Sequence, residues 1–121
     1  MQSVVYAFVI LIALEHIVFL VLEMFLWIKP IGQKIFEQTK EEAEVNAVLA
    51  ANQGLYNGFL AAGLLWGVVH PNTLFGMQII TFFLVCIVIA GIYGGIIANR
   101  KIIYLQAVPA MIILLLVGVS M

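Results

Sequence analysis

Apolar residues dominate the chain in four long runs that short polar segments separate. The runs cover about residues 4–28, 45–69, 74–98 and 102–121. A spanning helix needs about 20 predominantly apolar residues, because the hydrocarbon core of a bilayer is about 30 Å thick. Each run meets that length. The pattern therefore predicts an all-α integral membrane four-helix bundle, up-down-up-down, forming a single domain over residues 1–121.

The connection 29–44 is the segment with enough residues to fold outside the membrane. Pro30 ends the first run, because proline lacks a backbone donor and disfavours helix in the residue before it. Thr39 and Glu42 have the spacing of a capping box, so we expect the second helix to begin ahead of its apolar run. Apolar side chains beside a lysine favour a short stretch lying at the membrane interface, and these are Ile31, Ile35 and Phe36.

The basic residues predict the direction of insertion. All five lie in the first and third connections, at Lys29, Lys34, Lys40, Arg100 and Lys101. The positive-inside rule places these connections in the cytoplasm and both termini outside the cell membrane. Trp27 and Trp66, near the ends of their runs, fit the aromatic belts that anchor spanning helices.

Composition supports the same class of protein. The chain is 65% hydrophobic and 9% charged, which is typical of a membrane protein and makes the lipid bilayer its expected surroundings. A formal net charge of -1 with five basic residues excludes nucleic acid as an expected partner. Cys86, inside an apolar run, is interpreted as a small packed hydrophobe.

Three titratable residues interrupt the first run: Glu15, His16 and Glu23. A central acid costs about 2.5–3.5 kcal/mol on insertion scales, and the neighbouring apolar residues offset that cost. At about 100° per residue the three side chains share one arc of the helix, which we expect to face the bundle interior. No Lys or Arg lies in the four runs, so both acids are candidates for carboxyl groups that stay protonated or share a proton.

The second run carries a polar stripe of its own. Asn46, Gln53 and Asn57 follow spacings of seven and four residues, which place them on one helical face. Asn52 and Tyr56 flank this face, and we expect the stripe to face inward. Gly54, Gly58 and Ala62 recur at every fourth residue, a pattern that predicts close helix packing.

Matching the runs by depth predicts a polar site inside the membrane. If the spans centre near His16, Asn57, Cys86 and Met111, Glu23 lies near the depth of Asn52 and Gln53. Glu15 and His16 then lie near the depth of Asn57. The expected ligand-binding residues are Glu23, Asn52, Gln53, Tyr56, Asn57, Tyr93 and Tyr104. The candidate catalytic residues are Glu15, His16 and Glu23.

Several further residues bear on that site. Pro109 is expected to kink or locally open the last helix. Gly91, Gly94 and Gly95 thin the third helix, which either makes room for a ligand or reflects ordinary packing. The His and acid residues of the spans lack the spacing of three or four that helical metal ligands use, so no metal or cofactor is predicted.

The segments LEHIVFLVLEMFLWIKPIG and AANQGLYNGFLAAGLLWG resemble a family of small four-helix bacterial membrane proteins, Domain of Unknown Function 1304. This resemblance covers essentially the whole chain. It implies a multi-pass protein of the bacterial inner membrane and no activity. A more distant similarity is to the MAPEG group, four-helix membrane enzymes acting on eicosanoids and glutathione. That group holds glutathione with arginines in its helices, and these spans contain none.

Three functions remain open on these observations. The intramembrane acids, histidine and amides favour a protein that binds, and in one version transforms, a small lipophilic molecule. A proton-coupled transporter or channel-like oligomer would use Glu15, His16 and Glu23 as a proton relay. A structural or accessory membrane protein would use the same polar groups to join helices. No motif identifies a reaction, so whether the chain is an enzyme is left open. The small-residue faces suggest a homo-oligomer.

Overall fold

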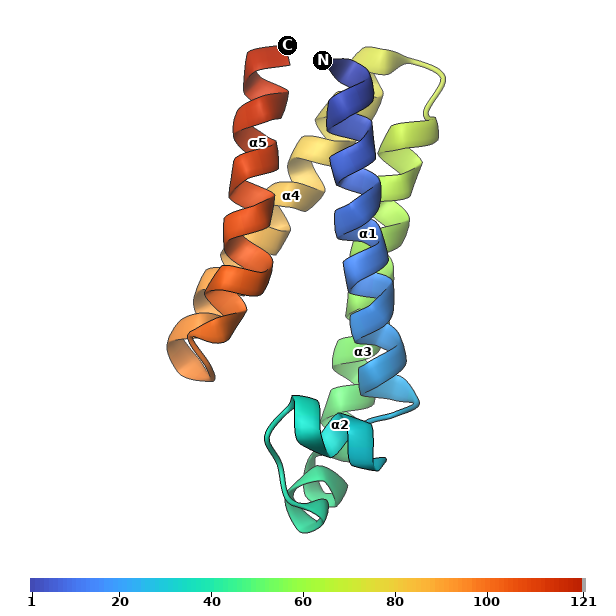
Figure 1. Ribbon diagram of the computed structural model, residues 1–121. Coiled ribbons are helices and arrows are strands. Elements are labelled where there is room, and N and C mark those ends of the chain that lie inside the picture. Colours follow the sequence, from blue (N-terminus) through green and yellow to red (C-terminus); the bar gives the residue numbers. More distant parts are fainter. Residues whose placement is uncertain (121) are drawn as a thin grey trace. The chain divides into compact units, whose positions relative to one another are not determined.

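The structure is a computed structural model that describes Met1–Ser120, and these residues form helices, turns and no strand. The elements are the helices α1 (Gln2–Met24), α2 (Pro30–Ile35), α3 (Lys40–Val69), α4 (Thr73–Ile97) and α5 (Val108–Ser120), with the π-helix η1 (Ile103–Ala107) directly before α5 (Figure 1). The predicted all-α class is confirmed.

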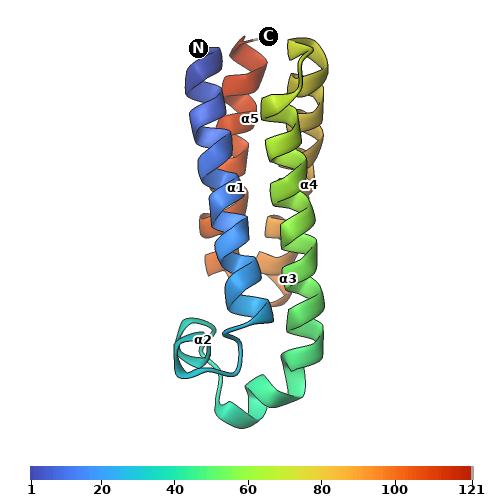
Figure 2. The same cartoon turned by 90° about the vertical axis from the view of Figure 1, so that its right-hand side faces the viewer.

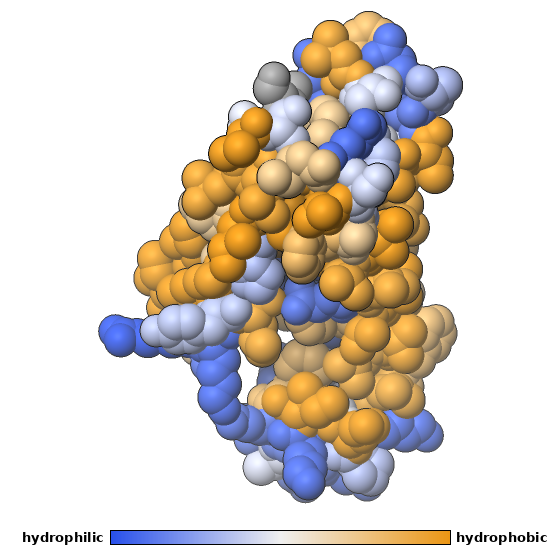
Figure 3. Space-filling view, turned by 45° about the horizontal axis from the view of Figure 1, so that its top comes forward, coloured by the Kyte–Doolittle hydropathy of each residue, from blue (hydrophilic) through white to orange (hydrophobic). Residues whose placement is uncertain are grey.

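Three helices among the described residues are long and apolar enough to cross a membrane. They are α1, α4 and the continuous segment Ile103–Ser120. Apolar side chains accordingly cover much of the face seen in Figure 3. α3 has 30 residues and would be about 45 Å long, which exceeds the span of a bilayer core. It is less apolar than the other three because it begins with the charged residues Lys40, Glu41, Glu42 and Glu44 and carries the amide side chains of the predicted polar stripe.

The first helix ends at Met24, whereas the sequence predicted an end at 28. The Leu26 N–H donates to the Val21 carbonyl 3.2 Å away, a wide turn that closes the helix. Trp27 then donates from Nε1 to the Ala43 carbonyl at 2.9 Å. Gly32 lies so close to the Leu26 carbonyl that a Cβ there would overlap it. The helix therefore ends before the proline, and the contact of Trp27 with Ala43, sixteen residues away, is one that the sequence pattern does not contain.

The predicted capping box at the start of α3 is confirmed. The Thr39 N–H donates to Glu42 Oε1 at 3.1 Å, and the Glu42 N–H donates to Thr39 Oγ1 at 3.1 Å. These two bonds satisfy backbone donors that a helix start leaves free. α3 therefore begins at Lys40, five residues ahead of the apolar run.

The predicted local opening at Pro109 takes the form of a π-helix. Proline cannot donate to the carbonyl four residues earlier, and the Val108 N–H instead bonds to the Ile103 carbonyl. A Cβ on Gly91 would lie 2.8 Å from the Ala107 backbone nitrogen, so α4 approaches η1 closely. Gly95 lies against the side chain of Ile103, which a Cβ there would overlap. Of the two interpretations of these glycines, the contacts favour ordinary packing.

The chain divides into two compact units. One contains residues 1–13 and the described chain from Ala62 onward, where α4 and α5 pack against each other and are joined at their lower ends (Figure 2). Its largest fully buried side chains include Leu64, Ile80, Leu84 and Ile87. The other unit, Leu14–Ala61, holds the second half of α1, α2 and most of α3. This second unit contains most of the predicted polar residues.

Candidate functional site

A side-chain hydrogen bond joins the predicted polar stripes of α1 and α3. Asn57 Nδ2 donates to Glu23 Oε1 at 2.5 Å. The Asn57 side chain is buried, and Glu23 is half-buried. A charged or protonatable group inside the hydrocarbon needs such a partner, because lipid offers no hydrogen bonds. The structure thus brings together two of the predicted site residues. The depth argument had matched Asn57 with Glu15 and His16 instead, and that pairing is corrected here.

Small residues on α3 allow this contact. A Cβ on Gly54 would lie 2.7 Å from Met24 Cγ and 3.1 Å from Glu23 Cβ. A Cβ on Gly58 would lie 2.7 Å from Leu20 Cδ1. Both glycines therefore let the backbones of α1 and α3 approach, as the spacing of small residues predicts. Ala62, the third member of that pattern, is exposed.

Glu15 and His16 form a second polar group on α1. Glu15 Oε1 lies 3.9 Å from His16 Nδ1, and His16 is fully buried with its ring edge-on to Phe19. The Glu15 Oε1 atom is also buried, and it has no hydrogen-bond partner among the described residues. A buried acceptor left without a donor costs about 1–3 kcal/mol, so this atom calls for an explanation beyond packing.

The predicted stripe on α3 is divided between two sides of the helix. Asn57 is buried and Asn46 is half-buried, but Asn52, Gln53 and Tyr56 are exposed. Asn52 and Asn57 are five residues apart, which turns their side chains about 140° away from each other. Of the three stripe residues that we expected to face inward, Gln53 is exposed, and so are the flanking residues Asn52 and Tyr56. Their role in binding a ligand stays a prediction.

Tyr93 and Tyr104 lie in the other unit, on α4 and η1. Their side chains are 64% and 72% exposed. Their place in a common site with Glu23 stays a prediction that rests on the depth argument. Within residues 1–120, no group of three or more His, Cys, Asp or Glu side chains is arranged to hold a metal ion.

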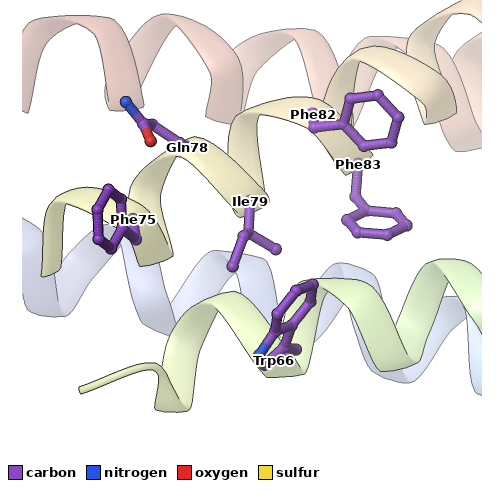
Figure 4. A pocket seen from close by; sticks show the side chains of 6 residues that line it. All are labelled: Trp66, Phe75, Gln78, Ile79, Phe82 and Phe83. Atoms are coloured by element: carbon purple, nitrogen blue, oxygen red, sulfur yellow. The ribbon is translucent and has the colours of Figure 1, made fainter. Parts of the chain in front are cut away.

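One surface groove was not anticipated from the sequence. It has a volume of about 410 Å³ and lies on the unit that contains α4. Figure 4 shows Ile79 of α4 pointing toward Trp66 of α3, with Phe82 and Phe83 further along α4. Phe75 and Gln78 complete the lining. In the sequence, the aromatic residues at the end of α3 and the start of α4 were the signal that could have predicted this groove. The sequence analysis interpreted one of them, Trp66, as a membrane anchor.

These features define a small all-helical protein with three helices able to cross a membrane. One of them, α1, carries a cluster of polar residues, Glu15, His16 and Glu23. The family model described as "Protein of unknown function (DUF1304)" matches residues 10–118, so the chain belongs to this family. A bacterial relative, the uncharacterized protein YpaA of Lactococcus lactis subsp. lactis (strain IL1403), is 32% identical over 108 residues, which are 88% of this chain and 89% of that protein. No solved structure matches the chain. The family predicted from the sequence is confirmed.

Proposed function

We propose that the protein binds a small lipophilic molecule through the polar groups of Glu15, His16, Glu23 and Asn57. In this proposal it is a multi-pass protein of the bacterial inner membrane. α3 is its fourth span, so that four helices form an up-down-up-down bundle with both termini outside the cell. The length of α3 and the five basic residues in two connections support this topology.

The observation that carries the proposal is the Glu15 Oε1 atom, which is buried without a hydrogen-bond partner among the described residues. Packing alone gives no reason to keep an acid there, since an apolar residue of the same shape would avoid the cost. A hydroxyl or amine donor on a lipophilic ligand would satisfy this oxygen. The apolar body of such a ligand would suit the surrounding hydrocarbon.

A structural role is the second candidate, and the Glu23–Asn57 hydrogen bond favours it. Interhelical hydrogen bonds and small residues are the usual means of joining helices in membranes. Both features occur here at the same place, where Gly54 lies against Glu23. The two candidates differ in what they require of Glu15, which a purely structural account leaves without a function.

Glu15→Met separates them, because methionine keeps the length of the side chain and removes both oxygens. The full chain is purified in mild detergent and its extractable lipophiles are quantified by mass spectrometry, with unfolding measured on the same samples. We expect at least a tenfold loss of one co-purified lipophile. We also expect an unchanged or higher free energy of unfolding, because a buried unsatisfied acceptor is removed.

Glu41→Gln is the matched control, since Glu41 is an exposed acid at the start of α3. It should leave both the lipophile content and the unfolding unchanged. If Glu15→Met retained every lipophile of the wild type, the binding proposal would be rejected. A loss of stability in Glu15→Met together with unchanged lipophiles would assign the acid to the structural role.

A further inference from the structure

The turn between α3 and α4 contains His70, one of the two histidines of the chain. Its imidazole lies between two aromatic rings, with centroid distances of 6.3 Å to Trp66 of α3 and 6.0 Å to Phe75 of α4. All three residues belong to the unit that contains α4, so the arrangement is contained in one compact unit. Trp66 and Phe75 also line the surface groove of that unit (Figure 4). His70 therefore lies beside two residues of the groove lining.

A backbone hydrogen bond indicates which ring nitrogen of His70 carries no proton. The Asn72 N–H donates to His70 Nδ1 at 3.0 Å. The planar peptide group fixes the direction of a backbone N–H, so Nδ1 is the acceptor and is unprotonated. The tautomer assigned from this bond is the neutral imidazole with its proton on Nε2. The observed turn therefore requires an uncharged His70.

Asn72, the partner of His70, is the N-cap residue of α4. Its Oδ1 accepts from the Phe75 N–H at 3.0 Å, and its carbonyl oxygen accepts from the Gly76 N–H at 2.9 Å. These bonds satisfy backbone donors that the start of a helix leaves free. The bond from Asn72 to His70 holds in place the residue that makes them. His70 thus supports the first turn of α4 and, through it, the position of Phe75.

Protonation of Nδ1 would reverse this support. A protonated Nδ1 cannot accept, so the Asn72 N–H loses its partner. The new N–H lies 3.1 Å from the Asn72 carbonyl oxygen, where it competes with the Gly76 N–H for the same acceptor. A positive charge at the N-terminus of α4 is also unfavourable, because the helix dipole is positive at that end. Each of these effects weakens the cap.

The chain on either side of His70 carries no charge that could offset its protonation. Residues 45–99, which include α4 and most of α3, contain no Asp, Glu, Lys or Arg. The other titratable side chains there are Tyr56, Cys86 and Tyr93. Among the described residues, the hydrogen bonds and ring contacts of His70 are those with Asn72, Trp66 and Phe75. The charge of this turn therefore depends on His70 alone.

We propose that His70 is a pH sensor in the turn between α3 and α4, whose protonation releases the cap of α4 and moves Phe75 in the groove lining. The membrane topology given under Proposed function, on which this part rests, places the turn outside the cell, so the sensor meets the pH of the medium. Histidine suits this role because its charge changes between about pH 5 and 8. The groove then has one shape in a neutral medium and another in an acidic one.

Amide hydrogen exchange of the full chain in detergent micelles tests the proposal. From about pH 8 to about pH 5, the protection factor of the Phe75 N–H should fall about tenfold, as expected for the loss of an N-cap. Protection factors are compared because they remove the intrinsic effect of pH on exchange. The Glu42 N–H is the control, since its cap on Thr39 contains no imidazole. Its protection factor should stay constant.

Two substitutions of His70 separate a sensor from a purely structural residue. His70→Asn keeps an acceptor oxygen near the position of Nδ1 but has no proton to gain in this pH range. Phe75 should then be equally and highly protected at both pH values. His70→Phe keeps a ring between Trp66 and Phe75 but offers no acceptor, so protection should be low at both. A wild type without pH dependence, or a His70→Asn variant with the same dependence as the wild type, would overturn the proposal.

Fluorescence of Trp66 supplies the second measurement, in a Trp27→Phe background that leaves one tryptophan. Acidification should change its emission over the same pH range as the Phe75 exchange, and His70→Asn should abolish the change. Glu15→Met should leave both responses unaltered, so a failure of the proposed binding function is recognised separately.

The direction of the turn is tested by His70→Cys in a Cys86→Ala background, which leaves one thiol. A membrane-impermeant thiol reagent should label this variant in intact cells. Labelling only after the cells are broken would overturn the outward direction of the sensor.

Discussion

Asn57 on α3 donates a hydrogen bond of 2.5 Å to the Glu23 carboxyl on α1, and the Asn57 side chain is only 5% exposed. The bond connects residues 34 positions apart in the chain. Gly54 lies one turn of α3 away and brings the two backbones close enough for it to form. A polar contact and a packing contact thus reinforce each other at the same point of the helix pair.

Removing the donor of this bond should destabilise the protein. Asn57→Ala is expected to lower the free energy of unfolding by about 1–3 kcal/mol, because the Glu23 oxygen loses its partner in an apolar environment. The measurement is reversible unfolding in detergent micelles. Gln53→Ala removes an exposed amide from the same helix and should change stability by less than about 0.5 kcal/mol. Equal effects of the two substitutions would show that the bond contributes nothing.

Filling the space at Gly54 should separate α1 from α3. Gly54→Leu places side-chain atoms where Met24 and Glu23 already lie, and overpacking of this kind costs about 1–3 kcal/mol. Gly118→Leu is the same substitution at a helical glycine with nothing within 4 Å of its added Cβ. That control should unfold like the wild type. The prediction fails if both variants keep wild-type stability in the same micelle assay.

Loss of the capping box should fray the start of α3. Thr39→Ala removes the oxygen that accepts from the Glu42 N–H, which costs about 0.5–2 kcal/mol at a helix start. Amide hydrogen exchange of Glu42 should become faster by the corresponding factor. Thr39→Ser keeps the hydroxyl and should exchange like the wild type. Unaltered exchange in Thr39→Ala would mean that the cap does not hold this helix end.

The indole of Trp27 should hold the segment 28–39 in place through its hydrogen bond to Ala43 of α3. Trp27→Phe keeps an aromatic ring near Phe36 but removes the donor to the Ala43 carbonyl, a change worth about 0.5–1.5 kcal/mol. Limited proteolysis should then cut within residues 29–44 faster than in the wild type. Trp66→Phe changes the other tryptophan, which is exposed in the groove on α4, and should leave that cleavage rate as it was.

Local sequence signals predicted the features that depend on neighbouring residues. The Thr39–Glu42 box, the opening before Pro109 and the glycine contacts of α3 all follow from spacings within one helical turn. The end of α1 lies at Met24 and not at 28, and the chain after it is tied to Ala43 by Trp27, sixteen residues away. Such a contact leaves no periodic signal in either segment.

The amides of α3 show the same limit. Their spacing indicated a polar stripe, and an amide stripe in an apolar helix is expected to face protein rather than lipid. The structure instead covers Asn57 and leaves Asn52, Gln53 and Tyr56 exposed. Which part of a stripe is buried depends on where the neighbouring helix lies, and a single helix does not contain that information.

By itself the sequence determined the helical class, the approximate positions of the long helices, the family and the acids and histidine of α1. It could do so because hydropathy, capping and helix period act over a few residues. Only the tertiary structure decided that Asn57 pairs with Glu23 while Asn52 faces away. That choice depends on how closely α1 and α3 approach, and the approach is fixed by atoms of Gly54, Leu20 and Met24 that are distant in the chain.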